Sequence, residues 1–483
     1  MEVQLPDLPM VKIFSFLDPF SLLQASQVNK YWNKIAENDH LWRMLCQDRW
    51  DLGSFSYQHL GTRTWKQFFF HKVKEERRMA QAQPDDFIYK EVSENLGMGT
   101  ENMAYVSGSG FTMDEQKKSV VCTVSSKYLL HAWDVQEGIM TWSSPIQKFR
   151  IIKLATLPQM QLAITVDLNR TIKVWNCQDR DALAALTIPH ACYSLETFLT
   201  KDGPFLMVGD DKGDIHTFTV PGLRDVSKVD AFRWPVELLL CSPDKEWVFA
   251  CETCAKGILP KVFFLECLLR PSEDSTPLSI SLPFKSCCRG CWAPRQKNRI
   301  ILMSQSSSGK KTGFITFDLK TRKTRGQTVV QAIEIASFLL PANLPYPLCM
   351  GTSDGYLIVI DSGKYLLLFT IGGILLQRFE YHQEAICNLW VDSIHVLTTS
   401  FDGSLHVYMW EEGGHPPYLK SCCHLEKIHQ TLTGSFADKG NMNGEVRILK
   451  LQTRQAPLKR LWTPPQPSPN SVLNGALIPS QKL

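Results

Sequence analysis

The chain has 483 residues, enough for more than one folding unit, because single hydrophobic cores stop growing at about 250–300 residues. Hydrophobic residues make up 44% and charged residues 21%, and a net charge of +4 over this length points neither to nucleic acid nor to a membrane surface as a partner. No stretch is apolar for about 18 residues, so we expect no membrane-spanning helix. The first residues lack a secretory signal; we therefore expect 15 reduced cysteines and a location in the cytoplasm or nucleus.

The first forty-odd residues have apolar side chains at helical spacing. Val11, Phe14 and Leu17 follow one another at intervals of three and predict one apolar helix face. Asp18 and Pro19 mark the start of a second helix, because a carboxylate accepts hydrogen bonds from first-turn amides and proline has no amide to leave unpaired. The buried side of that helix is predicted to hold Leu22, Leu23 and Ala25.

A third helix is predicted by Val28, Trp32 and Ile35, which lie at positions i, i+4 and i+7. Asp39 is placed to cap a last turn. That turn presents Leu41, Trp42 and Leu45. The sequence thus predicts three short helices between residues 5 and 46. Since about forty residues cannot bury so many large side chains alone, part of this surface should contact a partner.

The order of these residues resembles the F-box, a short helical module that docks proteins onto the Skp1 subunit of cullin-based ubiquitin ligases. The matching positions are Leu5-Pro6, the block from Ile13 to Pro19, Leu22-Leu23, Val28-Asn29-Lys30 with Trp32, and Leu41-Trp42. At Leu8-Pro9 the family usually has an acidic and an aliphatic residue, so we expect the first helix to begin a turn late. The resemblance implies Skp1 contacts by Leu5, Pro6, Ile13, Phe14, Leu17, Pro19, Leu22, Leu23, Val28, Trp32, Leu41 and Trp42.

Residues 51–86 are predicted to link this module, residues 1–50, to the rest of the chain. A polar loop is followed by an aromatic run from Trp65 to Phe70 and a charged run from Lys72 to Arg78. This pattern indicates a helix with one aromatic side and one solvated side.

From residue 87 the pattern changes to short alternating strands broken by turn signals such as Asp-Gly and Asn-Gly. An aromatic residue near a strand end recurs at intervals between 39 residues (Phe369 to Tyr408) and 53 residues (Phe264 to Phe317). Such a period is typical of β-propeller blades. The recurring positions are Trp133, Trp175, Phe218, Phe264, Phe317, Phe369 and Tyr408, with Leu449 as a weaker eighth and Ile360 as an alternative to Phe369.

These segments resemble degenerate WD repeats, and only Trp133-Asp134 keeps the dipeptide that names the family. Turns of the form Asp-x-x-Gly or Asp-Gly precede several strands, as at Asp210, Asp354 and Asp402. We therefore expect an α plus all-β architecture: a three-helix F-box, a helical linker and a seven- or eight-bladed WD40-type β-propeller over residues 87–452. Residues 453–483 are rich in proline and are expected to be mostly disordered, with one further strand near residues 458–462.

Cysteine pairs are the strongest metal signal in the sequence. Cys251 and Cys254, and Cys288 and Cys291, have the two-residue spacing of zinc ligands, but both pairs fall in strand-like segments, which favours packing over metal binding. The motifs of zinc proteases, serine hydrolases and phosphate-binding loops are absent from the sequence. We therefore expect no catalytic, metal or cofactor site and interpret the chain as a non-catalytic adaptor.

An F-box followed by WD repeats resembles the Fbw class of substrate receptors. The resemblance implies binding to Skp1, and through it to cullin-1 and a RING subunit, with a protein substrate on the propeller. The substrate is unknown; candidates for reading a phosphorylated one are Arg170, Lys173, Lys212, Arg233 and Lys261. The alternative is a propeller scaffold whose F-box no longer recruits the ligase. Neither nucleic acid nor a membrane is expected as a partner.

Overall fold

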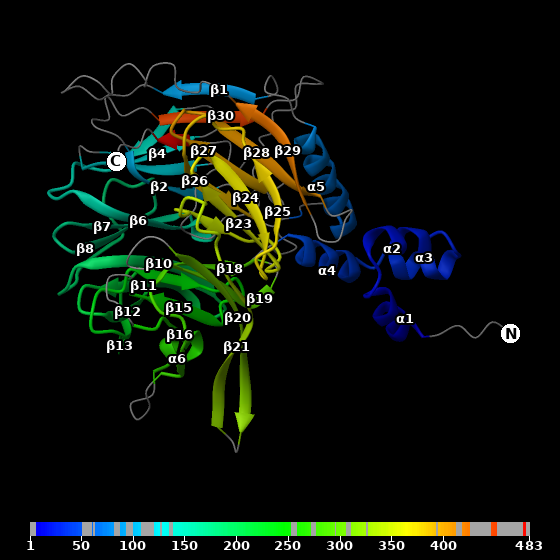
Figure 1. The fold of residues 1–483 in the computed structure, drawn as a ribbon, viewed down its shortest axis with the longest axis horizontal. Coiled ribbons are helices and arrows are strands. Elements are labelled where there is room, and N and C mark those ends of the chain that lie inside the picture. The colour runs from blue at the N-terminus through cyan, green and yellow to red at the C-terminus, as the bar shows by residue number, and fades with distance from the viewer. Residues whose placement is uncertain are drawn as a thin grey trace.

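The computed structural model describes seventeen segments of the chain. They are residues 6–50, 60, 63–81, 87–92, 100–107, 120–125, 128–134, 139–252, 258–271, 277–294, 296–305, 311–324, 327–392, 395–411, 418–425, 446–451 and 477–479. Helices come first and strands follow (Figure 1). Within these segments, no helix has both the length and the apolar character needed to cross a membrane.

Residues 6–50 form four helices, α1 (Asp7–Phe14), α2 (Pro19–Ala25), α3 (Lys30–Ala36) and α4 (Asp39–Arg49). The prediction of three helices is wrong because the extended backbone of Asn38 separates α3 from α4, and its side chain caps α4 by accepting from the His40 N–H. The expectation of a late start is also wrong. Helix α1 begins at Asp7 and includes Pro9 in its first turn, where the missing amide costs no hydrogen bond.

Seven four-stranded antiparallel sheets follow, each made of four strands in chain order. The first three are β2 (Thr100–Ser107), β3 (Val120–Ser125), β4 (Leu130–Asp134), β5 (Ile139–Ser143); β6 (Ile151–Leu157), β7 (Leu162–Asp167), β8 (Thr171–Trp175), β9 (Ala184–Thr187); β10 (Cys192–Thr200), β11 (Gly203–Asp210), β12 (Asp214–Thr219), β13 (Asp225–Asp230).

The fourth and fifth sheets are β14 (Leu238–Cys241), β15 (Trp247–Cys251), β16 (Lys261–Phe264), β17 (Ser279–Ser281); β18 (Cys287–Ala293), β19 (Gln296–Gln305), β20 (Thr312–Thr324), β21 (Gln327–Leu339). The sixth and seventh are β22 (Met350–Gly351), β23 (Leu357–Ser362), β24 (Tyr365–Thr370), β25 (Leu375–Phe379); β26 (Ile386–Val391), β27 (His395–Ser400), β28 (Leu405–Glu411), β29 (Tyr418–Leu425). Short helices η3 (Pro158–Met160) and α6 (Leu265–Leu269) lie in the second and fourth sheets' connections.

The sheets are the blades of a WD-type propeller. First strands of successive blades are neighbours, from β2 beside β6 through to β22 beside β26. Every predicted aromatic position of the first seven repeats lies in the third strand of its blade, and Phe369 rather than Ile360 occupies it in the sixth. In the first two blades the tryptophan has a partner on the second strand: the Trp133 and Trp175 indole N–H groups donate to threonine hydroxyls at 2.8 and 2.9 Å.

An eighth sheet joins the two ends of the repeat region. Strand β1 (Phe87–Val92), which precedes the first blade, pairs with β30 (Val446–Leu451), and β31 (Leu477–Pro479) adds to β30. Leu449, the weakest predicted strand end, lies in β30. Strand β31 falls within the segment expected to be disordered, so that expectation is wrong for residues 477–479. The strand predicted near residues 458–462 lies outside the described residues.

The predicted linker helix is α5 (Trp65–Ala80). Trp65, Phe68 and Phe69 are buried on its aromatic side, whereas Lys74 and Arg77 are exposed, as the sequence predicts. Phe70 is partly exposed and the Lys72 side chain is buried. The aromatic side packs on α4, so the helix is part of the folded structure rather than a loose connection.

Candidate partner-binding face of the N-terminal helices

Side-chain caps set the starts of the N-terminal helices. Asp18 accepts hydrogen bonds from the backbone N–H groups of Phe20 and Ser21 at 2.9 and 3.0 Å, and the Ser21 hydroxyl donates to its second oxygen at 2.6 Å. The Ser21 hydroxyl, followed by the Ser21 backbone N–H, holds the pKa of the Asp18 carboxyl below its usual value. Asn29 accepts from the Trp32 N–H at 2.8 Å at the start of α3. These bonds fix where α2 and α3 begin and therefore which of their side chains face inward.

The four helices share one core. Phe14 meets Trp32 edge to face with ring centroids 5.4 Å apart, and the Trp42 indole N–H donates to the Ala36 carbonyl at 2.8 Å. The buried side chains of the module are Met10, Phe14, Leu22, Ala25, Ile35, Ala36, Leu41, Trp42 and Cys46. Burial raises the pKa of the Cys46 thiol, so this cysteine is a neutral packing group.

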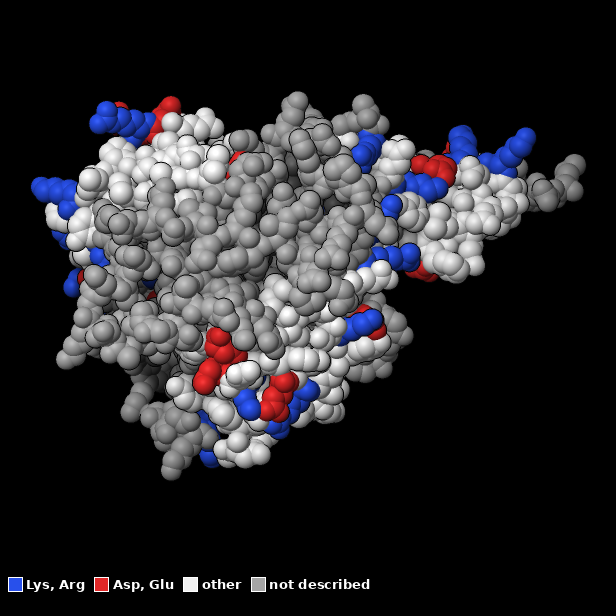
Figure 2. Space-filling view, turned by 90° about the horizontal axis from the view of Figure 1, so that it is seen from above, with Lys and Arg blue, Asp and Glu red and all other residues white. Residues whose placement is uncertain are grey.

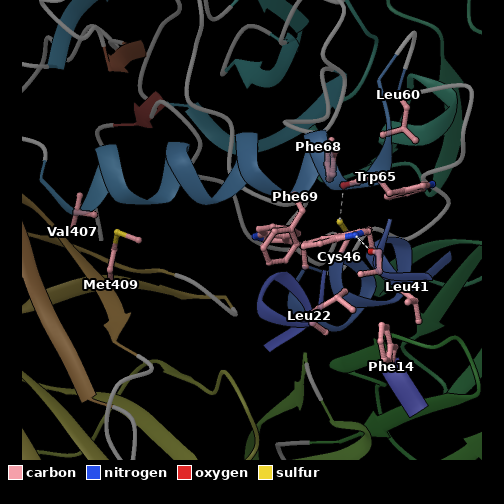
Figure 3. Close-up of a cluster of buried hydrophobic side chains, with 14 of the residues drawn as sticks. Phe14, Leu22, Leu41, Cys46, Leu60, Trp65, Phe68, Phe69, Val407 and Met409 are labelled. Atoms are coloured by element: carbon pink, nitrogen blue, oxygen red, sulfur yellow. Dashed lines mark hydrogen bonds between the residues drawn. The ribbon is translucent and has the colours of Figure 1, made fainter. Parts of the chain in front are cut away.

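Helix α5 is fastened to α4 through its first residue. The Trp65 backbone N–H donates to the Asp39 carboxylate at 2.9 Å, and the Cys46 thiol donates to the Trp65 carbonyl at 3.8 Å (Figure 3). The predicted role of Asp39 as a helix cap is therefore wrong, because Asn38 caps α4 and Asp39 holds α5 instead. The Phe69 ring also packs on Trp42 with centroids 5.5 Å apart.

The same core continues into the seventh blade. In Figure 3, Trp65, Phe68 and Phe69 lie toward one end of α5, and Val407 and Met409 of β28 lie toward the other. The blade residues in this cluster are Trp390, Leu397, Leu405, Val407, Met409, Cys423 and Leu425. One continuous apolar cluster thus connects the N-terminal helices with the propeller.

Several large apolar side chains of the module face solvent instead. They are Leu8 (84% exposed), Phe16 (77%), Phe20 (67%), Val28 (60%) and Ile13 (49%), which we call the exposed apolar face. They lie on α1, α2 and the turns after them, which project away from the blades (Figure 1). The Lys12 ammonium lies 5.0 Å from the Phe16 ring centroid. In Figure 2 the outer end of the module shows uncharged surface bordered by Lys and Arg. Large contiguous patches of exposed apolar surface are common at sites of protein contact.

Comparison with known proteins assigns the chain to a family. Residues 3–48 match the F-box-like family model. The chain is 65% identical to human F-box/WD repeat-containing protein 12 over 436 residues, which cover 90% of this chain and 93% of that protein. It is 43% identical to mouse F-box/WD repeat-containing protein 15 over 464 residues, covering 95% of this chain and 98% of that protein.

The chain belongs to the F-box/WD-repeat family.

Membership of this family indicates which kind of partner the F-box of this chain has. An F-box implies a Skp1-type partner, and F-box/WD-repeat proteins are typically non-catalytic adaptors. Mouse F-box only protein 16 is 41% identical over 73 residues, 15% of this chain and 22% of that protein. This shorter match to a protein named for its F-box alone agrees with the F-box being a separate module.

The structure divides the residues predicted to contact Skp1 into three groups. Phe14, Leu22, Leu41 and Trp42 are buried in the core of the folded chain. Leu17, Pro19, Leu23 and Trp32 are partly buried, and Pro6, Ile13 and Val28 are exposed. Leu5 lies outside the described residues.

Sequence reasoning missed Leu8, Phe16 and Phe20. Phe16 and Phe20 stand in and beside the block from Ile13 to Pro19 that carries the family resemblance, so a signal was present. Ile13, Phe16 and Phe20 are spaced as i, i+3 and i+7, but this row runs through the turn between α1 and α2 rather than along one helix. Leu8 was interpreted as a departure from the family instead of as an exposed side chain.

The basic residues considered for phosphate recognition are partly engaged within the propeller. The Arg170 guanidinium donates to the Pro189 carbonyl, the Lys173 ammonium donates to the Gln147 side chain at 2.6 Å, and the Lys261 ammonium donates to the Ala231 carbonyl at 2.5 Å. Arg233 and Lys212 are exposed. No substrate-binding residue is identified among the described residues.

The cysteines singled out as possible zinc ligands lie in strands. The Cys251 thiol in β15 donates to the Glu252 carbonyl at 3.2 Å, and the Cys288 thiol in β18 donates to the Met303 carbonyl at 3.4 Å. Burial raises the pKa of Cys291 to about 12. Cys254 lies outside the described residues.

One cluster of possible metal-ligating groups occurs among the described residues. Ligand atoms of Asp210, Asp214 and His216 lie within 4.8 Å of one another. Asp210 accepts the backbone N–H of Lys212 and of Asp214 at 2.9 Å each, as expected of a tight Asp-x-x-Gly turn. Asp214 forms an ion pair with Lys228 at 2.8 Å. These bonds give the cluster a structural role in the third blade.

Proposed function

We propose that this protein is the substrate-recognition subunit of an SCF ubiquitin ligase. In this proposal the F-box binds Skp1, and through it cullin-1 and a RING subunit, in the cytoplasm or nucleus. The propeller holds a protein substrate. Catalysis is left to other subunits, and the chain contributes by raising the local concentration of substrate near the ubiquitin carrier.

The exposed apolar face is the observation that carries this proposal. Leu8, Ile13, Phe16, Phe20 and Val28 cannot be covered by the chain's own core, which already holds the inward side of the same helices. Truncation of large aromatic side chains at the centre of an interface usually has the greatest effect on affinity. Phe16 and Phe20 are therefore the expected anchors for Skp1.

The connection through α5 supports the second half of the proposal. A receptor must hold its substrate at a defined position relative to the ligase, and a flexible tether would not do so. The cluster that joins Trp42 of the F-box, Phe69 of α5 and Met409 of the seventh blade provides a fixed connection.

The test is capture of purified Skp1–cullin-1 by the full chain carrying Phe16→Ala and Phe20→Ala. Both side chains are exposed, so folding should be unaffected. The affinity for Skp1–cullin-1 should fall by about a thousandfold, taking about 2 kcal/mol for each hot-spot residue. Phe401→Ala is a matched control, because Phe401 is an exposed aromatic residue of the seventh blade.

Two results would contradict the proposal. Unchanged capture by the double variant would mean that Skp1 binds elsewhere. Failure of the folded wild-type chain to retain Skp1 and cullin-1 would favour the alternative, a propeller scaffold that no longer recruits the ligase.

A further inference from the structure

The fifth blade ends in a hairpin much longer than the rest of the propeller requires. Strands β20 and β21 have 13 residues each, whereas the other strands of the seven four-stranded sheets have two to ten. The two strands stay paired from Gly313 and Leu339 at the base to Thr324 and Gln327 at the turn. Figure 1 shows their outer half extending beyond the neighbouring blades. We call this outer half, residues 318–324 and 327–333, the arm.

The outer strand of the arm has an open hydrogen-bonding edge. In the sheet order β18-β19-β20-β21, strand β21 pairs with β20 on one side only. Backbone N–H and C=O groups of an edge strand that point away from the sheet are free to pair with another strand. Over Gln327–Ile333 the sequence is QTVVQAI, without charge or proline. Proteins usually protect such an edge with a charged residue or proline on the edge strand itself, and the first such residue of β21 is the exposed Glu334, which follows this stretch.

The two faces of the arm differ. One face continues the core against the fourth blade, with Leu319 and Val330 buried. On the opposite face the cross-strand pairs are Ile333 with Asp318, Gln331 with Lys320 and Val329 with Arg322. All but Asp318 in these three pairs are exposed. This open face therefore combines aliphatic side chains on the edge strand with cations on the strand behind it.

The apolar surface continues from the arm onto the sixth blade. Arg299 forms an ion pair with Asp318 at 2.6 Å, donates to the Gly355 carbonyl at 3.2 Å and lies 4.6 Å from the Tyr356 ring centroid. At the hairpin base, Phe338 packs against Gly373, where an added Cβ would come within 2.6 Å of the ring. The exposed apolar side chains on the two elements that meet here are Ile333 and Ile335 of β21 and Tyr356, Ile374 and Leu375 of the sixth blade.

The positive charge of the arm favours an acidic partner. Residues 318–334 contain four cations, Lys320, Arg322, Lys323 and Arg325, and two carboxylates, Asp318 and Glu334, at the two ends of the stretch. The Glu334 side chain accepts a hydrogen bond from the Ser337 hydroxyl. Asp318 is already neutralised by Arg299. Among the described residues, no carboxylate forms an ion pair with Lys320 or Arg322. An incoming strand would place alternate side chains on the face that Val329 and Ile333 share with these cations.

We propose that the edge of β21 binds an extended, acidic segment of another protein by strand addition. The partner segment carries apolar side chains at every second position and carboxylates nearby. Main-chain hydrogen bonds to β21 supply affinity, whereas the exposed aliphatic residues and the cations of β20 supply selectivity. This surface is separate from the F-box and does not depend on Skp1 binding.

The test uses the full chain and a fluorescent twelve-residue peptide that alternates valine with glutamate. We expect binding, slower hydrogen exchange of the β21 amides on the open edge, and weaker binding at high salt. A peptide alternating valine with lysine should not bind. The valine–glutamate peptide with every amide N-methylated, which blocks both edges, should not bind either, because it keeps the side chains but cannot donate hydrogen bonds to β21.

Charge-reversal variants distinguish binding at the arm from binding elsewhere on the propeller. Lys320→Glu with Arg322→Glu should weaken binding at least about tenfold, whereas Lys201→Glu with Lys285→Glu, exposed cations elsewhere on the propeller, should leave it unchanged. The inference is overturned if the peptide does not bind, if the N-methylated peptide binds equally well, or if arm reversal has no effect. It is also overturned if the protein is a dimer whose β21 amides are already protected, since a second copy would then occupy the edge.

Discussion

Phe14 and Phe16 lie two residues apart and have opposite roles. Phe14 is buried against Trp32, whereas Phe16 lies beyond the end of α1 and faces solvent. Loss of a buried phenylalanine removes its apolar contacts and leaves a cavity, which typically costs about 3–5 kcal/mol. An exposed phenylalanine such as Phe16 makes few contacts within the fold, so its truncation should change the free energy of unfolding little.

We therefore predict that Phe14→Ala lowers the unfolding temperature of the F-box and speeds proteolysis within it, whereas Phe16→Ala leaves both unchanged. Differential scanning fluorimetry and limited trypsin digestion of the full chain measure the two effects. Equal stability of the two variants would contradict the burial of Phe14. The comparison also shows why Trp32 and Leu17 are poor positions for testing Skp1 binding: both pack on the core, so changing them alters folding as well.

Two buried histidines of the seventh blade predict a response to acid. His382 lies between the hydroxyls of Ser404 and Thr398, at 2.6 and 2.7 Å, and His406 contacts the Ser421 hydroxyl at 2.8 Å. Burial lowers the pKa of His382 to about 4 and that of His406 to about 3. The Asp402 carboxylate acts to raise the pKa of His382, whereas His424 lowers the pKa of both histidines. Burial has the largest effect on each, so both pKa values are lowered.

The sign of the pH dependence follows from these pKa values. In the unfolded chain both histidines take up protons as the pH falls below about 6.5, whereas in the folded blade they stay neutral until about pH 4 or lower. The unfolded state therefore binds more protons, and each histidine should cost about 1 kcal/mol of stability per pH unit across that window. Urea unfolding of the full chain from pH 7 to pH 5 tests this. His406→Gln should flatten the slope, and an unchanged slope would count against the role of His406.

Among the elements, those with a strong local signal were predictable. The third strand of each blade could be placed because its aromatic residue recurs at blade spacing and is buried between neighbouring sheets, as for Trp133 and Trp175. Helix α2 could be placed because Asp18 and Pro19 define its start chemically. Local chemistry determined these features, and so the sequence alone was sufficient.

Elements whose formation depends on residues far away in the sequence could not be predicted from local patterns. The separation of α3 from α4 depends on Asn38 capping in place of Asp39, whose carboxylate is drawn to the Trp65 amide 26 residues later. Strand β31 exists by pairing with β30. Likewise, helical spacing places Phe14 and Phe16 in one apolar segment but cannot say which is covered, because that depends on Trp32 in another helix.

At the scale of the whole molecule, the important feature is how the F-box is held on the propeller. Their shared cluster passes through α5, and Val407 and Met409 are its contribution from β28 (Figure 3). The opposite face of that strand carries His406 and Tyr408, and Tyr408 packs in a cluster shared with the sixth blade. Alternation along one strand thus allows the seventh blade to pack on the sixth blade with one face while the other face supports the F-box.

Uncoupling the F-box from the blade should separate binding from ubiquitin transfer. Val407→Thr with Met409→Gln preserves side-chain size but places polar groups in the apolar contact, which costs free energy because their hydrogen bonds to water are lost. We expect faster hydrogen exchange in α5, unchanged capture of Skp1 through the distant exposed apolar face, and slower transfer of ubiquitin to a substrate that still binds. Val329→Thr with Ile333→Thr on the exposed arm of the fifth blade is the matched control and should leave α5 exchange unaltered. If α5 exchange rises while transfer to the bound substrate keeps its wild-type rate, a fixed connection between F-box and propeller is not needed for positioning.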